Sequence, residues 1–351
     1  MPPLTYGYFG PAGTFTHQAL LLIADDQDVL TPFRTVVAAL DAVRAGEIDA
    51  AFVPIENSLE GGVSATLDYL ADDSQALMIR REVLLPVEFA LCVRPGTALG
   101  DVRSVLTHPH AAAQTRLWVA RHLPRAVVTE GPSTAGAAVE VSDPGSAHDA
   151  AICARIAGEM NGLEIVADGI ADNEDAVTRF VVVTRPATPP PATGADKTTL
   201  VAYMKVDRSG SLLGILEQIA GHGVNMTRIE SRPTKQALGS YCFSIDAEGH
   251  IDDARMQETL TGLHRVCAKV TFLGSYPRAD RQAPILDEGQ TNEAYAAARH
   301  WLDGLRHPGG ESHGHPGGES HGHPGGESHG HPGGDSSGHP GSDSLGRAGQ
   351  R

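Results

Sequence analysis

Residues 4–25 read LTYGYFGPAGTFTHQALLLIAD, and this stretch sets the pattern for the first half of the chain. Leu4–Phe9 predicts a β-strand, His17–Asp25 predicts a helix, and Gly10–Thr16 predicts a sharp turn between them. A helix that follows such a turn presents free N–H groups and the positive end of its dipole, which suit a carboxylate or a phosphate. No Gly-Lys-Ser/Thr follows, so the turn is not a nucleotide-binding loop. The alternative is a plain strand-to-helix turn capped by its own threonines.

The alternation of strands and helices continues to about residue 185, which predicts an α/β domain over residues 4–185 with a largely parallel sheet. Further strands are expected at Ala50–Val53, Arg103–Leu106, Ala126–Thr129, Ala150–Cys153 and Phe180–Val183. Further helices are expected at Val36–Ala45, Ala111–His122 and Thr134–Val141. A long β-like stretch, Ala76–Arg94, interrupts this rhythm and is expected to link two lobes.

Prolines at positions 186, 189, 190 and 191 mark residues 186–196 as a stiff linker and a domain boundary. Residues 197–277 then follow the order strand, helix, strand, strand, helix, strand, which is the ferredoxin-like βαββαβ unit. The expected elements are Thr199–Val206, Gly210–His222, Val224–Glu230, Ser240–Ala247, Asp252–His264 and Val266–Leu273. A second, smaller domain is therefore predicted.

Residues 278–306 form an extension in which apolar residues at helical spacing predict one helix, 292–305. Residues 307–351 repeat the octapeptide His-Pro-Gly-Gly-Glu-Ser-His-Gly, which decays toward the end of the chain. This composition has almost nothing apolar to bury, so it predicts a disordered tail. Paired imidazoles such as His313 and His315 suit transition metals, but a solvated extension without a metal is the interpretation adopted.

The formal net charge of −16 makes nucleic acid and anionic membranes poor partners, because both repel an acidic surface. The apolar runs fall far short of the ~20 residues that cross a bilayer. Met1–Thr5 has neither the basic nor the apolar region of a secretory signal, so a cytoplasmic protein is expected. The four cysteines form no CxxC pair and are expected to be small buried hydrophobic residues.

Polar residues follow the ends of several predicted strands, which is where α/β sheets bind ligands. In Val53–Gly62 these residues are Asn57 and Ser58, each both a donor and an acceptor of hydrogen bonds. In His108–Gln114 the glutamine falls about one turn into a helix that begins at a proline. A helix cap and a surface glutamine are the structural alternatives.

A third polar group, Thr178-Arg179-Phe180, enters the strand Val181–Val183. An arginine beside a hydroxyl is suited to bind a carboxylate with a proton donor close by. The alternative is an exposed arginine at the start of a strand.

Together these motifs resemble those of the prephenate dehydratases. The patterns GPxGTF, PIENSxxG, HP…Q and TRF occur in the order and at the spacing of that family, between Leu4 and Pro186. Residues 197–277 are similar to the ACT domain that follows the catalytic unit in this family, with Gly210-Ser211-Leu212-Leu213 and Glu230-Ser231-Arg232-Pro233 as its signatures. The chain departs from the pattern at His110, where many members have Gln, and at Ala176, where many have Asn.

The resemblance implies two lobes around a cleft, like a type 2 periplasmic binding protein, and decarboxylative dehydration of prephenate to phenylpyruvate without a metal or organic cofactor. It places Thr178 at the leaving hydroxyl, Arg179 at one carboxylate, and Asn57, Ser58 and Gln114 at oxygens of the substrate. It completes the substrate-binding set with Gly13, Thr14, Glu56 and Phe180.

The resemblance further implies ACT domains that pair in a homo-oligomer and bind L-phenylalanine as an inhibitor. The residues it assigns to that effector are Gly210, Ser211, Leu212, Leu213, Asn225, Met226, Glu230, Ser231, Arg232 and Pro233. Two other functions stay open at this point: an arogenate dehydratase, whose substrate has an amine in place of the keto group, and a non-catalytic amino-acid sensor. The chain lacks a helical mutase domain and a GxGxxG fingerprint, so a single activity is expected.

Overall fold

A computed structural model describes residues 2–72, 77–173, 175–234 and 241–307. Residues 1–302 form one compact unit, and every site discussed below lies within it. The predicted octapeptide tail lies outside the described residues from position 308 onward. Among the described residues, no helix has the length and apolar character needed to cross a membrane.

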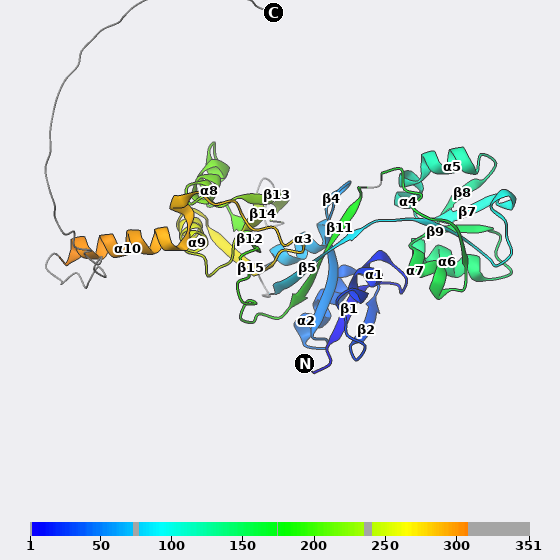
Figure 1. Cartoon of the computed structure of the whole chain (residues 1–351), viewed down its shortest axis with the longest axis horizontal. Helices are drawn as coiled ribbons and strands as arrows, with labels where there is room; N and C mark the ends of the chain where they lie inside the picture. The colour runs from blue at the N-terminus through cyan, green and yellow to red at the C-terminus, as the bar shows by residue number, and fades with distance from the viewer. Residues whose placement is uncertain (1, 73–76, 174, 235–240, 308–351) are drawn as a thin grey trace, which may run out of the picture. The chain divides into compact units, whose positions relative to one another are not determined.

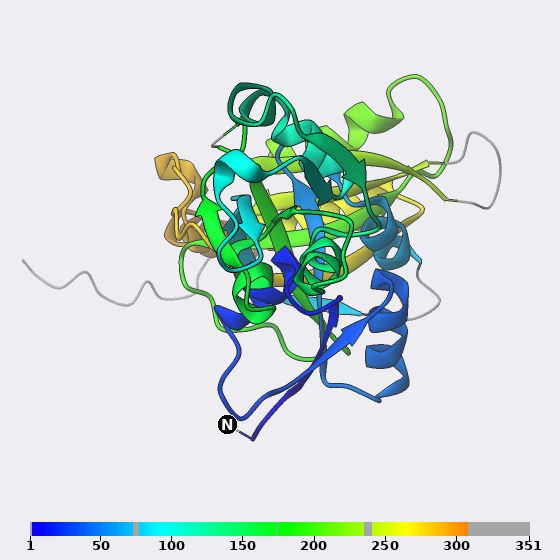
Figure 2. The same cartoon turned by 90° about the vertical axis from the view of Figure 1, so that its right-hand side faces the viewer.

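The first sheet has the strand order β2-β1-β3-β11-β5, with the short strand β4 paired to β3. Its strands are β1 (Thr5–Phe9), β2 (Val29–Phe33), β3 (Ala50–Asn57), β4 (Gly61–Gly62), β5 (Met78–Pro86) and β11 (Val177–Thr184). β1 runs parallel to β2 and β3, whereas β11 runs antiparallel to β3 and β5. Helix α1 (Phe15–Leu21) packs on one face, and α2 (Val36–Ala45) and α3 (Ser64–Ala71) pack on the other (Figure 2).

The second sheet has the strand order β10-β6-β9-β7-β8 and forms the other lobe (Figure 1). Its strands are β6 (Ala90–Val93), β7 (Ser104–Thr107), β8 (Val127–Glu130), β9 (Ala150–Cys153) and β10 (Glu164–Ala167). Its helices are α4 (Pro109–Gln114), α5 (Arg116–His122), α6 (Thr134–Ser142) and α7 (Arg155–Met160), with a short 3₁₀ turn at Leu99–Asp101.

The predicted α/β class is confirmed, but the expected largely parallel sheet is wrong. There are two sheets, and each combines parallel with antiparallel pairs. The stretch Ala76–Arg94 supplies β5 to the first sheet and β6 to the second, so it links the two lobes as predicted. The expected helix Ala111–His122 is divided at Thr115, whose hydroxyl donates to the Ala111 carbonyl oxygen.

The third sheet follows the Pro-rich segment and has the predicted order strand, helix, strand, strand, helix, strand. It comprises β12 (Asp196–Tyr203), α8 (Ser211–Ala220), β13 (Met226–Pro233), β14 (Tyr241–Glu248), α9 (Ala254–Val266) and β15 (Lys269–Pro277). The strand order is β13-β14-β12-β15, and all three neighbouring pairs are antiparallel. A 3₁₀ turn (Glu288–Gln290) and the helix α10 (Asn292–Arg306) follow, close to the predicted helix 292–305.

The first and third sheets share one hydrophobic core. Alternate residues of β11 point to opposite faces, so Val181 and Val183 join this core while Phe180 and Val182 pack toward α1. Val201 and Leu273 of the third sheet lie in the same core as Val181 and Val183. At Gly274 a Cβ atom would lie 2.2 Å from the carbonyl oxygen of Ile79 in β5, so only glycine permits this approach of the two sheets.

All four cysteines are buried, as their apolar surroundings predicted. Cys92 and Cys153 lie on neighbouring strands of the second sheet, with their sulfur atoms 3.6 Å apart. Burial raises the pKa of the thiols of Cys242 and Cys267, so both stay protonated. These two residues therefore act as packing residues within the core.

Candidate active site and effector pocket

A pocket of about 250 Å³ lies between the two lobes and receives residues from both sheets. The first lobe supplies polar groups from the start of α1, from the end of β3 and the turn after it, and from β11, namely Thr14, Thr16, Asn57, Glu60 and Thr178. The second lobe supplies polar groups from both ends of α4 and from the start of α6, namely His108, His110, Gln114, Ser133 and Thr134. Phe9, Phe15, Val87 and Phe89 form an apolar wall.

Thr178 and Asn57 form the central polar contact of this pocket. The two lie opposite each other on β11 and β3, and Asn57 Nδ2 donates to Thr178 Oγ1 at 2.9 Å. Asn57 Oδ1 accepts the backbone N–H groups of Leu59 and Glu60, at 2.9 and 3.2 Å, which fixes the orientation of the amide. Because Thr178 Oγ1 acts here as an acceptor, its own proton is left to be donated into the pocket.

Ser58 supports the Thr178 strand from outside the pocket lining. Its hydroxyl oxygen accepts the N–H of Val177 at 3.0 Å, and its own N–H donates to the Val177 carbonyl oxygen at 2.9 Å. Ser58 therefore holds the residue that precedes Thr178 and does not line the pocket, and its contact with the substrate stays a prediction.

Three helices begin at the pocket, each after a residue with a capping side chain. Thr14 Oγ1 accepts the N–H of His17 at the start of α1, His108 Nδ1 accepts the N–H of His110 at the start of α4, and Ser133 Oγ accepts the N–H of Gly136 at the start of α6. Helix N-termini carry partial positive charge. The pocket therefore receives partial positive charge from three helix starts, although the protein as a whole is acidic.

No lysine or arginine lines this pocket among the residues that the structure describes. Its titratable groups are Glu60, His108 and His110, and His110 Nδ1 lies 2.8 Å from Glu60 Oε1. Burial, with a contribution from nearby His110, lowers the pKa of His108, so its imidazole is neutral near pH 7. Binding of an anion here depends on N–H dipoles and hydroxyl groups.

The expected contact of Arg179 with a substrate carboxylate does not fit the structure. Arg179 follows Thr178 in the same strand, so its side chain points to the opposite face of the sheet and into the core shared with the third sheet. It is only 5% exposed, and Glu82, Asp246 and Glu56 surround its guanidinium at 2.7, 2.5 and 3.2 Å. Arg179 is therefore absent from the pocket lining.

Three other residues assigned to substrate binding also lie outside the lining. Glu56 pairs with Arg179, and Phe180 is buried and stacks on Phe52 with ring centroids 5.4 Å apart. Gly13 has a φ of 85°, and a Cβ there would lie 3.2 Å from Ala157 of the second lobe. Gly13 thus allows the α1 turn to approach α7, whereas Thr14 and Gln114 do line the pocket as expected.

A family model described as Prephenate dehydratase matches residues 6–188 of this chain. The prephenate dehydratase of Amycolatopsis methanolica is 44% identical over 296 residues, which cover 84% of this chain and 95% of that protein. The chain belongs to the prephenate dehydratase family. This agrees with the resemblance of its motifs.

Two solved structures resemble the chain over most of its length. The first is prephenate dehydratase from Arthrobacter aurescens in complex with L-Phe, with a TM-score of 0.81, 50% identity, and coverage of 86% of this chain and 99% of that one. The second is GqqA, described as a novel type of quorum quenching acylase, with a TM-score of 0.72, 31% identity, and coverage of 79% and 100%.

In this member of the prephenate dehydratase family, Ser133, Thr134 and His108 line the pocket although the sequence interpretation did not select them. Ser133 and Thr134 follow β8 and begin α6, which is the same strand-to-helix signal that selected Thr14. The signal was therefore present for Ser133. The missing information was which helix starts face the cleft.

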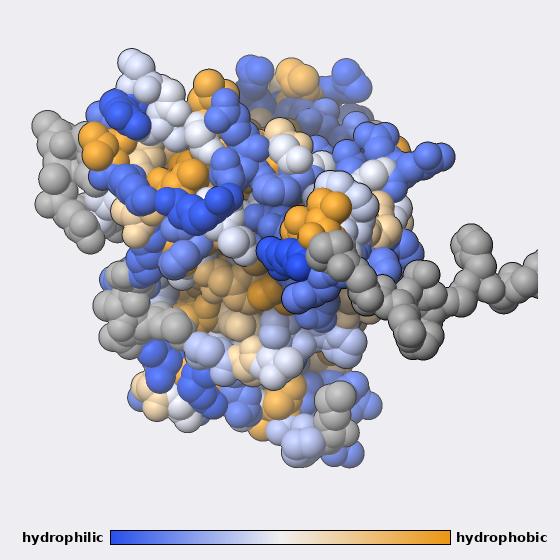
Figure 3. All heavy atoms as spheres, turned by 90° about the vertical axis from the view of Figure 1, so that its left-hand side faces the viewer, coloured by the Kyte–Doolittle hydropathy of each residue, from blue (hydrophilic) through white to orange (hydrophobic). Residues whose placement is uncertain are grey.

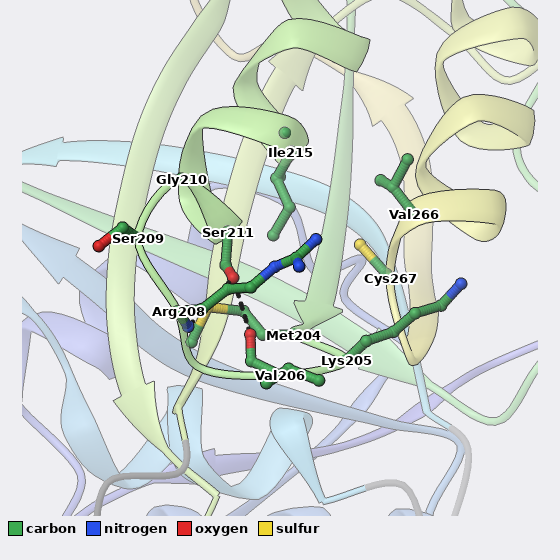
Figure 4. A pocket seen from close by; sticks show the side chains of 11 residues that line it. Met204, Lys205, Val206, Arg208, Ser209, Gly210, Ser211, Ile215, Val266 and Cys267 are labelled. Atoms are coloured by element: carbon green, nitrogen blue, oxygen red, sulfur yellow. Dashed lines mark hydrogen bonds between the residues drawn. The ribbon is translucent and has the colours of Figure 1, made fainter.

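Two further cavities flank the turn at Gly210, which has a φ of 87° and precedes α8. One, of about 620 Å³, is lined by the whole predicted turn together with Ser231 of β13, that is Gly210, Ser211, Leu212, Leu213 and Ser231. The other, of about 520 Å³, contains Arg208 and Lys205 among the apolar Met204, Ile215 and Val266 (Figure 4). Ser211 Oγ donates to the Val206 carbonyl oxygen at 2.7 Å and fixes the turn (Figure 4).

The other residues assigned to the effector do not line these two cavities. Asn225 is exposed, and Met226 packs against the core of the third sheet. Glu230 and Arg232 alternate with Ser231 along β13, so they face the first sheet, and Arg232 Nη2 lies 2.6 Å from Asp68 Oδ1 in α3. Pro233, at the end of β13, is exposed.

Proposed function

We propose that this protein converts prephenate to phenylpyruvate, carbon dioxide and water. The observation that carries the proposal is the Thr178–Asn57 pair in the pocket between two lobes, in a chain of this family. The ring carboxylate leaves as carbon dioxide, and the electrons of that C–C bond expel the ring hydroxyl, which takes up a proton and leaves as water. Aromatisation of the ring supplies the driving force.

Thr178 acts in this proposal on the leaving hydroxyl. Its oxygen accepts from Asn57 Nδ2, so its proton is directed to another acceptor, and the leaving hydroxyl is that acceptor. A threonine hydroxyl is a weak acid, so it serves as a donor that relays a proton. General acid assistance of this kind is typically worth ~10²–10⁴-fold in rate.

The helix starts at Thr14 and Ser133 bind the two carboxylates in this proposal, with neutral His108 as a further donor. These contacts act at hydrogen-bonding distance, whereas the repulsion from a net charge of −16 is screened beyond about 8 Å at physiological ionic strength. The apolar wall receives the ring. Phe15 and Phe89 meet there edge to face, with ring centroids 5.3 Å apart.

The third sheet with its two helices is proposed to be an ACT domain that binds L-phenylalanine and inhibits the enzyme. Support comes from the cavities at the Gly210 turn and from the L-Phe complex of the Arthrobacter aurescens relative. Exposed Leu212 and Leu213 beside the turn support pairing of these domains in a homo-oligomer. Figure 3, which faces the end of the molecule that carries α8 and α9, shows apolar patches among hydrophilic ones.

The two lobes are proposed to form a type 2 periplasmic-binding-protein-like catalytic domain over residues 4–185, with residues 186–196 as linker and 197–277 as regulatory domain. The strand order β2-β1-β3-β11-β5 and the two connections between the lobes support this assignment. A cytoplasmic location stays a prediction, as does the absence of nucleic acid and membrane partners.

A single assay on the full-length protein tests the proposal. Prephenate and arogenate are supplied side by side, and phenylpyruvate and phenylalanine are measured as the respective products. An N-acylated amine is supplied as a third substrate, because of the similarity to the acylase GqqA. Turnover of prephenate that is lost in Thr178→Ala supports the proposal. Preferred turnover of arogenate or of the acylated compound contradicts it, and no turnover favours a non-catalytic sensor.

A further inference from the structure

A cluster of charged side chains is buried where the first and third sheets meet, on the face of β11 opposite the pocket. Arg179 Nη1 lies 2.5 Å from Asp246 Oδ2 of β14, and Arg179 Nε lies 2.7 Å from Glu82 Oε2 of β5. Arg179 Nη2 donates to the Tyr276 hydroxyl of β15 at 2.9 Å. Arg179 is 5% exposed and Asp246 is 0% exposed, so charged side chains of the two sheets pair with each other out of contact with solvent.

Asp246 is the centre of the part of this cluster that belongs to the third sheet. It accepts from Thr199 Oγ1 at 2.7 Å and from Arg228 Nε at 2.9 Å in addition to Arg179. Burial by itself raises the pKa of Asp246, but Arg179 and Arg228 outweigh burial and hold that pKa far below its ordinary value. The carboxylate is therefore charged in the folded protein.

The contacts continue from Arg228 to the hairpin of β3 and β4, which contains Asn57 and Gly62. Arg228 Nη1 lies 3.5 Å from Glu230 Oε1, and the Glu230 carboxylate packs on Gly62, where a Cβ would lie only 2.0 Å from Oε1. Gly62 pairs with Glu56, the residue before Asn57. Both ends of the Thr178–Asn57 contact are thus supported by the same cluster.

The backbone pairing of β11 is irregular on one side at this place. The ladder between β3 and β11 is irregular between Arg179 and Phe180, where Phe180 lies opposite Pro54, which has no N–H. The position of Thr178 relative to Asn57 therefore depends on side-chain contacts more than in a regular sheet. Side-chain contacts flank Thr178 on both sides: Ser58 Oγ accepts from Val177 N–H, and the charged cluster holds Arg179.

We propose that Asp246 is a positioning residue for the active site: it holds Arg179, and with it the start of β11, so that Thr178 meets Asn57. Binding of a ligand in the cavity beside Ser231 changes the position of Thr178 through the same cluster, because Ser231 and Glu230 are neighbours on opposite faces of β13. The inference rests on the proposed function in its use of Thr178 as the reacting group.

Tyr276→Phe and Tyr203→Phe in the full chain form a matched pair that tests the proposal. Each removes one phenolic hydroxyl that joins the third sheet to the first lobe. Tyr276 contacts Arg179 and Thr199, whereas the Tyr203 hydroxyl donates to the Ala71 carbonyl oxygen at the end of α3. In Tyr276→Phe we expect kcat to fall on the order of tenfold with KM nearly unchanged, and inhibition by L-phenylalanine to weaken. Tyr203→Phe keeps both wild-type values.

Asp246→Asn is the stronger variant, and it is measured at a temperature at which its circular dichroism matches wild type. We expect a larger loss of kcat than in Tyr276→Phe, with the same small change in KM. Wild-type kcat and wild-type inhibition in Tyr276→Phe overturn the proposal, even where Asp246→Asn does not fold. Equal losses in Tyr276→Phe and Tyr203→Phe also overturn it, because a general loosening of the interface then suffices.

Hydrogen exchange of the amides in 177–180 separates this inference from the proposed function. L-phenylalanine is expected to change their protection in wild type and in Tyr203→Phe but not in Tyr276→Phe. This readout needs no turnover, so it holds even where prephenate is not the substrate. The same response to L-phenylalanine in all three proteins contradicts the role of the cluster.

Discussion

The two faces of strand β11 differ in how they handle charge. On the pocket face, beside Thr178, the described lining contains neither lysine nor arginine, and anions meet helix N-termini and hydroxyl groups. On the opposite face, Arg179 lies among buried carboxylates from both sheets. The difference teaches that adjacent residues of one motif can have separate tasks: in our proposal Thr178 contacts the substrate, and Arg179 holds the strand.

Strand β13 repeats this division. Ser231 lines a cavity beside the Gly210 turn, and Glu230 faces the charged cluster and Gly62. A motif that is continuous in sequence is again divided between a cavity and the contact of the first and third sheets. The cluster therefore lies between the two cavities, one on each side of the joined sheets.

Removal of the Thr178 hydroxyl is the strongest test of the pocket face. Thr178→Ala is expected to lower kcat by about 10²–10⁴-fold with little change in KM, because the contact matters mainly in the transition state. Thr178→Ser is expected to keep part of the activity, since it retains the hydroxyl. Steady-state kinetics measure both variants. A wild-type kcat in the alanine variant would remove Thr178 from the mechanism.

Removal of Arg179 is the strongest test of the opposite face. Arg179→Ala leaves Asp246 and Glu82 buried with fewer partners, so the free energy of unfolding is expected to fall by about 3–5 kcal/mol. Urea denaturation measures the loss. The control is Arg155→Ala, which breaks the exposed ion pair with Asp168 and should leave stability nearly unchanged, because water screens that pair. Equal free energies of unfolding for Arg179→Ala and Arg155→Ala would mean that the buried cluster does not stabilise the contact of the two sheets.

Substitution of Gly210 tests the proposed binding of the effector at the turn before α8. Gly210→Ala introduces a Cβ at a φ of 87° with nothing within 4 Å, so it strains the backbone without a clash. The concentration of L-phenylalanine for half-maximal inhibition is expected to rise by about tenfold, within the usual range of allosteric coupling, while uninhibited kcat is unchanged. Gly100→Ala, where space is open and φ is not positive, is the control. Unchanged inhibition would place the effector elsewhere.

Deletion of the repeat tail is expected to have the smallest effect. The motif residues all precede it, and the two compared prephenate dehydratases match 84% and 86% of the chain. Removal of His307–Arg351 should leave kcat, KM and inhibition unchanged within about twofold, since changes in a terminal segment rarely couple to a packed site. Kinetics with and without a chelator check this. Activity that is chelator-sensitive in the full chain and lost on deletion would assign the tail a role.

The sequence by itself determined the order of strands and helices in the third sheet, the positions of the motifs at strand ends, and the family. Hydrophobic periodicity and turn residues act over a few positions, so they are visible locally. Successive side chains of a strand point to opposite faces of the sheet. The sequence alone therefore already places Thr178 and Arg179 on different faces, although both were first assigned to the substrate.

Only the tertiary structure decided what lies on each side of β11. Arg179 meets Asp246, which is 67 positions away in the sequence. The stretch Ala76–Arg94 supplies β5 to the first sheet, beside β11, and β6 to the second sheet. Likewise the start of α6 at Ser133 faces the cleft only through the packing of the second lobe. Partners of buried charges are chosen by the long-range packing of sheets, and no local pattern carries that information.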